Sequence, residues 1–286
     1  MYEVTMTKKV LFFLTLLFSS NAHSDVLMLI RDDVYTNYQQ FLNGRDVLEV
    51  NNFSSPFIRR DVVDMIIVQQ ALELGGFKHK FRYGKGKVNY RNKQLLIKGQ
   101  LLLSFDSYWL ADASELTEHV YVSAPVIRNG EYFAGIFANP NHPKVFQIKQ
   151  IEDLKQFTAV STSNWKTDWQ TLSELPLKEL IEESSWVSQA RMVEEMWVDF
   201  FLVPFYSSKE DIYEFDNIRL KHVPQIAVLL KDSRHFVISK KHPLGAEAIN
   251  AIDKGLALMR SQGKIVKAYT EAGFFIDPSK YHIINQ

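Results

Sequence analysis

The hydrophobic pattern of this chain is clearest between residues 235 and 274. Phe236, Val237 and Ile238 form an apolar run typical of a buried strand, and a charged break follows at 240–243. Apolar residues then recur three and four positions apart, which predicts an amphipathic helix carrying Ala248, Ile249, Ile252, Leu256 and Met259. Gly263 is expected to end this helix. A second, short helix is expected to carry Ile265, Val266 and Tyr269.

The first part of the chain alternates short apolar runs with longer periodic segments. A helix is expected to begin at Ser55-Pro56, which pairs a capping residue with proline at the first helical position, and to end at Gly75-Gly76. The expected elements are strands at 25–30, 77–83 and 101–105, helices at 56–74 and 90–98, and a polar loop over 31–55. This β-α-β-α-β order predicts an α/β fold with helices on both faces of a sheet.

Motifs along the rest of the chain resemble those of the bacterial family 3 extracellular solute-binding proteins. They are Ser123-Ala124-Pro125 before a strand, residues 151–172, residues 192–205, and the strand, break and helix of 236–259. The resemblance implies an α/β, two-lobed fold of the type 2 periplasmic-binding-protein class, with two crossing strands between the lobes. It implies that residues 25–134 plus 233–286 form lobe 1 and residues 135–232 form lobe 2. It also implies ligand capture more than catalysis.

The N-terminal segment has the pattern of a cleaved signal peptide. Lys8 and Lys9 precede an apolar run over residues 10–18, and small residues at 22 and 24 suit cleavage before Asp25. Met6 is an alternative start. The apolar run is too short to span a bilayer comfortably, and the chain has no cysteine for a lipid anchor. We therefore expect residues 1–24 to be a signal peptide and the mature protein to be soluble and periplasmic.

Composition narrows the classes of function. The chain has 33 basic and 33 acidic residues, a balance that argues against wholesale nucleic-acid binding. Without cysteine no thiolate metal site can form, and neither a metal nor a cofactor is expected. The sequence contains no G-x-S-x-G, H-E-x-x-H or Walker motif, so no catalytic residue and no enzyme activity is predicted. An enzyme on the same fold is a further hypothesis, since the family resembles cyclohexadienyl dehydratase, but no acid–base pair stands out.

The resemblance also indicates where a ligand would bind. Amino-acid binders of the family hold the ligand with an arginine and an aspartate, and Leu116 and Pro204 occupy those positions here. A plain α-amino acid is therefore not the expected ligand. The predicted ligand-binding residues follow strands, where ligands lie in such folds: Arg31, Tyr35, Tyr108, Trp109, Ser161, Thr162, Ser163, Asn164 and Trp165. The aromatic residues could equally be ordinary packing, and the 161–164 turn could be a plain helix cap.

The sequence leaves two hypotheses for the partner protein in the membrane. One hypothesis is a monomeric solute-binding protein that delivers a small molecule to the membrane permease of an ABC-type uptake system. The alternative is a ligand-sensing subunit that regulates a membrane sensor protein. Residues 78–98 hold eight basic residues and no acidic residue, so this segment is a candidate docking face for such a partner, or simply a solvated surface.

Overall fold

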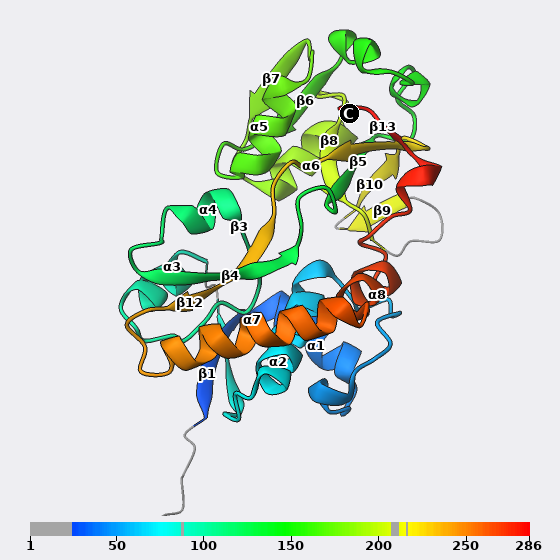
Figure 1. Ribbon diagram of the computed structural model, residues 1–286. Helices are drawn as coiled ribbons and strands as arrows, with labels where there is room; N and C mark the ends of the chain where they lie inside the picture. The colour runs from blue at the N-terminus through cyan, green and yellow to red at the C-terminus, as the bar shows by residue number, and fades with distance from the viewer. Residues whose placement is uncertain (1–24, 87–88, 207–211, 216) are drawn as a thin grey trace, which may run out of the picture.

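The computed structural model describes residues 25–86, 89–206, 212–215 and 217–286. Its elements form two groups, which we call lobe 1 and lobe 2, drawn in the lower and upper halves of Figure 1. The elements of lobe 1 are β1 (Val26–Arg31), α1 (Asp32–Leu42), the 3-10 helix η1 (Val47–Glu49), α2 (Arg60–Gly75), β2 (Phe81–Gly86), α3 (Asn89–Ile97), β3 (Tyr108–Trp109), α4 (Leu110–Ser114), β4 (Val120–Ile127), β12 (Arg234–Ser239), α7 (Gly245–Ser261) and α8 (Lys264–Glu271). No helix in the described ranges is both long and apolar enough to cross a membrane.

Lobe 2 holds most of the remaining strands. Its elements are β5 (Phe133–Ala138), the 3-10 helices η2 (Val145–Gln147) and η3 (Ile151–Gln156), β6 (Thr158–Ser161), α5 (Lys166–Glu174), β7 (Glu179–Glu182), α6 (Trp186–Glu194), β8 (Phe201–Pro204), β9 (Ile212–Phe215), β10 (Ile218–His222), β11 (Ile226–Leu229) and β13 (His282–Ile283). Strand β5 pairs with β8, β10 and β11, while β6 and β7 form a separate parallel pair. In lobe 1 the order β3-β12-β4 is antiparallel, and β1 pairs with β2 in parallel. The chain therefore has the predicted α/β class.

The chain passes between the lobes three times. It leaves lobe 1 after β4 at residues 128–132 and returns after β11 at residues 230–233. After α8 the chain crosses once more through the 3-10 helix η4 (Pro278–Lys280), and β13 pairs in parallel with β11 of lobe 2. The Asn285 side chain accepts a hydrogen bond from the Leu229 amide and donates one to the Leu229 carbonyl, each at 2.9 Å. These bonds attach the C-terminal segment to β11. The expected lobe boundaries stay predictions.

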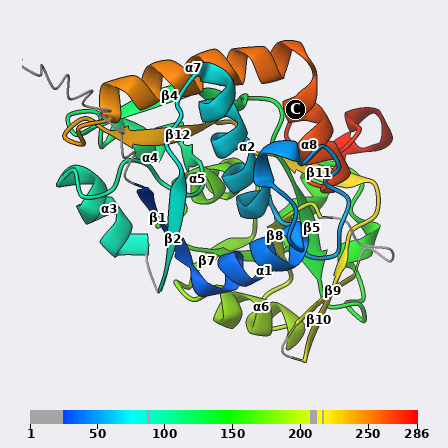
Figure 2. The same ribbon diagram turned by 90° about the horizontal axis from the view of Figure 1, so that it is seen from below.

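Two helices of lobe 1 touch through their backbones. Helices α2 and α7 lie side by side in both views (Figures 1 and 2). A Cβ atom added to Gly255 of α7 would lie 1.8 Å from the carbonyl oxygen of Ala71, and one added to Gly75 would lie 1.8 Å from that of Ala251. Helix α2 is buried at every residue from 61 to 72, as expected of a helix in the centre of a lobe. Only glycine permits the backbone approach at these two positions.

The structure confirms most of the predicted elements and corrects four. The helices over 90–98 and 244–262 are found as α3 and α7, but residues 32–42 form helix α1 where a loop was expected. That helix buries Val34, Tyr38, Phe41 and Leu42, a helical spacing hidden by the polar residues between them. Helix α2 starts at Arg60, four residues later than predicted. Strand β2 starts at Phe81, where a strand over 77–83 was expected. Residues 101–105 form no regular strand, with only a single bridge from Leu103 to Ile238.

The predicted signal peptide, including its apolar run and cleavage site, lies outside the described residues.

We predict that Gly255→Ala lowers the free energy of unfolding by about 1–3 kcal/mol, because the new methyl group forces α2 and α7 apart. Equilibrium denaturation with urea measures the loss. Lys254→Ala, at the exposed neighbouring position of α7, is the control and should stay within about 0.5 kcal/mol of the parent protein. Equal stability of the two variants would show that the close approach of α2 and α7 is not required.

Candidate functional site

A buried carboxylate joins three segments of lobe 1 where that lobe meets the crossing strands. Asp64 of α2 is fully buried. It accepts hydrogen bonds from the Ser107 amide at 2.9 Å and the Ser107 hydroxyl at 2.7 Å. It also accepts a hydrogen bond from the Tyr269 hydroxyl of α8 and forms an ion pair with Arg60, one turn earlier in α2. Because a buried charge is costly unless it is paired and hydrogen-bonded, these partners are what makes the position tenable.

Ser107 also accepts hydrogen bonds from Arg234, the first residue of β12, and so connects Arg234 to Asp64. The Arg234 Nε donates to the Ser107 hydroxyl at 3.0 Å, and its Nη2 donates to the Ser107 carbonyl. Its guanidinium carbon lies 4.6 Å from the centroid of the Trp109 ring, a cation–π distance. Among the described residues no hydrogen-bond acceptor or carboxylate partner contacts Nη1. Arg234 therefore keeps one donor group available beside the crossing segments.

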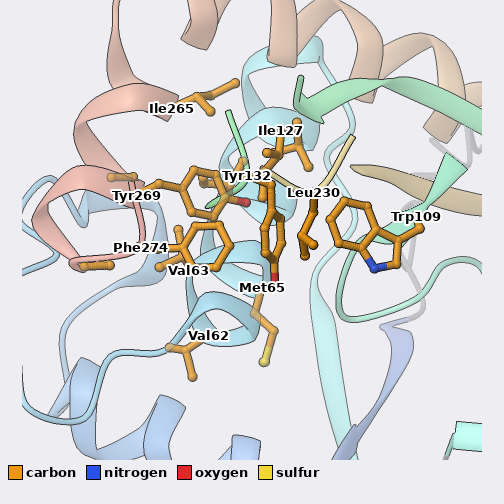
Figure 3. Close-up of a cluster of buried hydrophobic side chains, with 14 of the residues drawn as sticks. Val62, Val63, Met65, Trp109, Ile127, Tyr132, Leu230, Ile265, Tyr269 and Phe274 are labelled. Atoms are coloured by element: carbon orange, nitrogen blue, oxygen red, sulfur yellow. The ribbon is translucent and has the colours of Figure 1, made fainter. Parts of the chain in front are cut away.

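Aromatic rings form the wall behind this guanidinium. Figure 3 shows Tyr132, from the first crossing segment, between Trp109 and Phe274. The Tyr132 ring centroid lies 4.6 Å from that of Trp109 and 4.7 Å from that of Phe274, the latter pair in an edge-to-face arrangement. All three rings are buried. The wall thus joins β3, a crossing segment and the segment after α8.

Two carboxylates approach the same region from opposite lobes. Burial raises the pKa of Asp106 in lobe 1, although Arg60 and Arg234 act in the other direction. Burial also raises the pKa of Asp168, in the first turn of α5 in lobe 2, to about 6, again with Arg234 opposing the shift. Within the described residues, the Asp168 carboxylate has no ion pair and no hydrogen bond to another side chain. Asp168 of lobe 2 is therefore close enough to Arg234 for the two charges to interact, although they form no ion pair.

Direct contacts hold the two lobes together beside these groups. Lys166, at the start of α5, pairs with Glu115 and lies 3.5 Å from Asp112 of α4. Asp232, in the second crossing segment, accepts hydrogen bonds from the Thr167 hydroxyl at 3.3 Å and the Ala111 amide at 3.2 Å. A cavity of about 430 Å³ lies between α4, α5 and residues 231–232. Volumes of this size suit small molecules.

The predicted residues of the first strand end lie within lobe 1. Arg31 bonds Asp33 through Nε at 2.9 Å and Nη2 at 2.8 Å, and its Nη2 lies 3.6 Å from Asp61. The same hydrogen bonds lower the pKa of Asp33 to about 2. The Tyr35 ring packs against Tyr83 of β2, with centroids 5.9 Å apart. Arg31 is thus already paired with acids, and Tyr35 faces β2.

Of the predicted residues at the third strand end, Trp109 lies beside a crossing segment and Tyr108 packs within lobe 1. Tyr108 pairs with His235 across β3 and β12, and burial raises its pKa. Trp109 forms part of the aromatic wall described above. Leu116 lies in a buried apolar cluster with Val120 and Val237, and Pro204 pairs with Ala134 in the lobe 2 sheet. The ligand role of Tyr108 and Trp109 stays a prediction.

The predicted turn of lobe 2 is occupied by a carboxylate of the chain itself. Ser161 and Thr162 are buried, while Ser163 and Asn164 are exposed. Glu182 accepts hydrogen bonds from the Thr162 hydroxyl at 2.9 Å and from the Ser163 amide at 2.9 and 3.1 Å. The half-buried Trp165 precedes α5 and donates its amide to the Thr162 carbonyl. The turn therefore binds a carboxylate of the chain, and none of its side chains caps α5, whose N-cap residue is Trp165.

Sequence patterns missed the charged residues at the centre of the site. Arg60 and Asp64 form an i, i+4 pair in the first turns of a helix that is buried from 61 to 72, and charges in a buried helix are the signal that could have found them. Asp168 and Arg234 carried no comparable local signal. Within the described ranges, no group of three or more histidine or acidic side chains is placed to hold a metal ion.

The basic segment contributes to lobe 1 away from these charges. Lys78 pairs with Glu73, and the Lys85 ammonium lies 4.6 Å from the centroid of the Tyr35 ring. Lys87 lies outside the described residues. A docking role for residues 78–98 stays a prediction.

Comparison with protein-family models and with curated protein sequences gives no match for this chain. Solved structures do match. The GluR0 ligand-binding core in complex with L-glutamate has a TM-score of 0.53 at 10% identity and covers 88% of this chain and 99% of its own. The periplasmic VFT2 domain of BvgS from Bordetella pertussis has a TM-score of 0.52 at 14% identity, covering 73% of this chain and 83% of its own.

A third similar structure is the ancestral amino acid-binding protein AncCDT-1, a precursor of cyclohexadienyl dehydratase. It has a TM-score of 0.52 at 14% identity, covering 87% of this chain and 95% of its own. These likenesses show the fold. The chain has the two-lobed fold of type 2 periplasmic binding proteins, as the sequence resemblance implied.

We predict that Asp64→Asn lowers the free energy of unfolding by about 3–5 kcal/mol, because it leaves Arg60 without its buried counter-charge. Thermal and urea denaturation measure the effect. Asp46→Asn is the matched control, since Asp46 caps η1 at the exposed surface and asparagine caps a helix equally well. A stable Asp64→Asn variant would show that the Asp64 network is not essential to lobe 1.

Proposed function

We propose that this protein is an exported solute-binding protein that captures a small molecule between its two lobes for an ABC-type uptake system. The observation that carries the proposal is the pair of unsatisfied charged groups between the lobes. Asp168 comes from α5 of lobe 2, and Arg234 comes from β12 of lobe 1. A charged group of this kind loses solvation when the lobes close, and a ligand amine that bonds to Asp168 offsets that cost.

The ligand we propose carries a cationic or amine group, which binds Asp168, and is not a plain α-amino acid. The positions at which the family resemblance expected charged anchors are Leu116, in a buried apolar cluster, and Pro204, half-buried at the end of β8. The aromatic wall of Trp109 and Tyr132 already holds one cation, the Arg234 guanidinium, and provides an apolar surface beside the charges. Both features favour a ligand held by one carboxylate and by apolar contact.

Binding in this arrangement is coupled to hinge motion. The crossing segments at 128–132 and 230–233 are the places where the backbone can bend, and Lys166 supplies an ion pair that forms only when α5 approaches α4. A ligand between the lobes would add its own contacts to this pair. The chemistry required is recognition and closure, so the proposal assigns no catalytic step.

The alternative is a ligand-sensing subunit that regulates a membrane sensor protein. One similar structure is a periplasmic domain of BvgS, and another is a ligand-binding core, so the same fold serves in larger proteins. Deletion of the gene separates the two functions: loss of solute uptake supports delivery to a permease, whereas an altered response with unchanged uptake supports the sensor. A permease gene or a sensor gene beside it would point in the same directions.

The proposal is tested by a thermal-shift screen of organic cations, polyamines, aromatic acids, amino acids and short peptides. A compound that binds the native state raises the melting temperature, by mass action. Calorimetry then measures its affinity. We expect at least one amine-bearing compound to bind. A screen in which no small molecule shifts the melting temperature would contradict the proposal.

For a cationic ligand found in that screen, we predict that Asp168→Asn weakens binding by about 1.5–3 kcal/mol, the usual worth of a hydrogen bond to a charged group. Asp168 binds a cation when ionised, and its pKa is about 6. Affinity should therefore fall as pH is lowered through that value, and the dependence should be absent in the variant. Arg234 and Asp112 are the charged groups that act on Asp168, in opposite directions.

Calorimetry from about pH 5 to pH 8 checks both expectations. Glu152→Gln, at an exposed position in η3, is the control and should bind as the parent protein does. The same pH profile in the parent protein and Asp168→Asn would contradict a role for Asp168.

Export supplies a further prediction. Protein recovered from the periplasm should begin at Asp25, because the pattern of basic, apolar and small residues in 1–24 is that of a cleaved signal peptide. Intact-mass measurement checks the N-terminus. Protein that retains the N-terminal segment would argue against cleavage at this position.

A further inference from the structure

The turn between β6 and α5 binds a carboxylate that belongs to the chain. Strands β6 and β7 are parallel, and their register sets Ser161 beside Glu182. The Glu182 Oε1 accepts from the Thr162 hydroxyl at 2.9 Å, and its Oε1 and Oε2 accept from the Ser163 amide at 3.1 and 2.9 Å. The Ser163 hydroxyl lies 3.4 Å from Oε1. Three donors of this turn therefore contact one carboxylate.

This turn lies on the face of lobe 2 that meets lobe 1. Lys166, three residues after Ser163, pairs with Glu115, the residue that follows α4, and the Thr167 hydroxyl bonds Asp232 in the second crossing segment. Asp168, whose carboxylate has no ion pair and no hydrogen bond to another side chain among the described residues, follows in the same helical turn. The turn bound by Glu182 and the first turn of α5 that carries Asp168 are therefore consecutive parts of lobe 2.

The start of α5 is a position that favours an anion, since exposed amides and the helix dipole both attract negative charge. Glu182 already supplies that charge. A ligand carboxylate would have to displace Glu182 from its donors and would then stand beside a second carboxylate, and like charges at such distances repel. An amine or amidine, in contrast, can donate to the remaining lone pairs of Glu182 and to Asp168.

The arginine side chains of lobe 1 do not make the site favour a ligand carboxylate over an amine. Arg31 and Arg59 are paired with Asp33 and Asp61, and Arg60 is paired with Asp64. Arg234 has two of its donor nitrogens engaged by Ser107. The excess of unsatisfied acceptors is therefore at the α5 end of the site.

We propose that Glu182 is a specificity-determining residue of the interlobe site. It fills the anion position at the start of α5, so that the site takes a ligand presenting an amine or amidine there and rejects one presenting a carboxylate. The inference rests on the proposed function and identifies its ligand class as carboxylate-free organic amines.

Two matched ligand pairs test this selectivity. Agmatine differs from arginine, and putrescine from ornithine, by the absence of the α-carboxylate. Calorimetry on the parent protein should give the carboxylate-free member of a pair an affinity at least about tenfold higher. Glu182→Ala frees the turn, so the affinity for arginine or ornithine should rise relative to its partner by about tenfold. Glu182→Gln removes the charge but keeps one acceptor oxygen, and it should shift the ratio in the same direction.

Glu179→Ala, at the opposite end of β7, is the matched control and should leave the ratio unchanged. A lower melting temperature of Glu182→Ala with an unchanged ratio would show that Glu182 is only a structural cap and would overturn the inference. If Glu182→Ala fails to fold, the ratio in Glu182→Gln decides.

The outcomes also separate this inference from the proposed function. A parent protein that binds a carboxylate-bearing ligand as tightly as its carboxylate-free partner keeps the proposed function and overturns the role of Glu182. Binding of a carboxylate-free amine without binding of its carboxylate-bearing partner supports both the proposed function and the role of Glu182. Absence of binding by every compound in the four-member set and in the wider screen overturns both.

Discussion

The structure of this protein depends on the burial of one carboxylate. Asp64 lies on a helix whose surroundings are almost entirely apolar, and it is tenable there because Arg60, Ser107 and Tyr269 supply a counter-charge and three hydrogen bonds. Those partners come from α2, the segment before β3, and α8. The same Ser107 engages Arg234 at the start of β12. One buried charge therefore fixes the relative positions of the helices that form the core of lobe 1 and of the strand that leads into it from lobe 2.

The interlobe region lies beside this network and contains two further carboxylates, Asp168 and Glu182. Trp109, Tyr132 and Phe274 form an apolar wall, so the medium around the charges is of low polarity. Burial raises the pKa of Asp168 to about 6, while Glu182 is held by the donors of the turn before α5. The two carboxylates thus differ in their partners within the chain. Among the described residues, Asp168 has no hydrogen bond to another side chain.

Lobe 1 is closely packed, and a few segments of the chain connect it to lobe 2. Gly75 and Gly255 let α2 and α7 touch backbone to backbone, and close packing of this kind resists deformation. The lobes are connected by the crossing segments, to which the C-terminal strand β13 adds a third connection through its pairing with β11. The Lys166 ion pair with Glu115 adds a direct contact between the lobes.

The sequence by itself determined the elements whose signals are local. The apolar period of α7, the stop at Gly263 and the α/β class were all predictable, because burial of one face imposes a pattern on neighbouring positions. It also indicated that Leu116 and Pro204 are not charged anchors. Helix α1 was missed because polar residues interrupt its apolar face. Arg234, Asp168 and Glu182 could be assigned only in the tertiary structure. Residues 64, 107, 234 and 269 meet although they are far apart in the chain, and no periodicity within a segment records which distant charges will share a buried space.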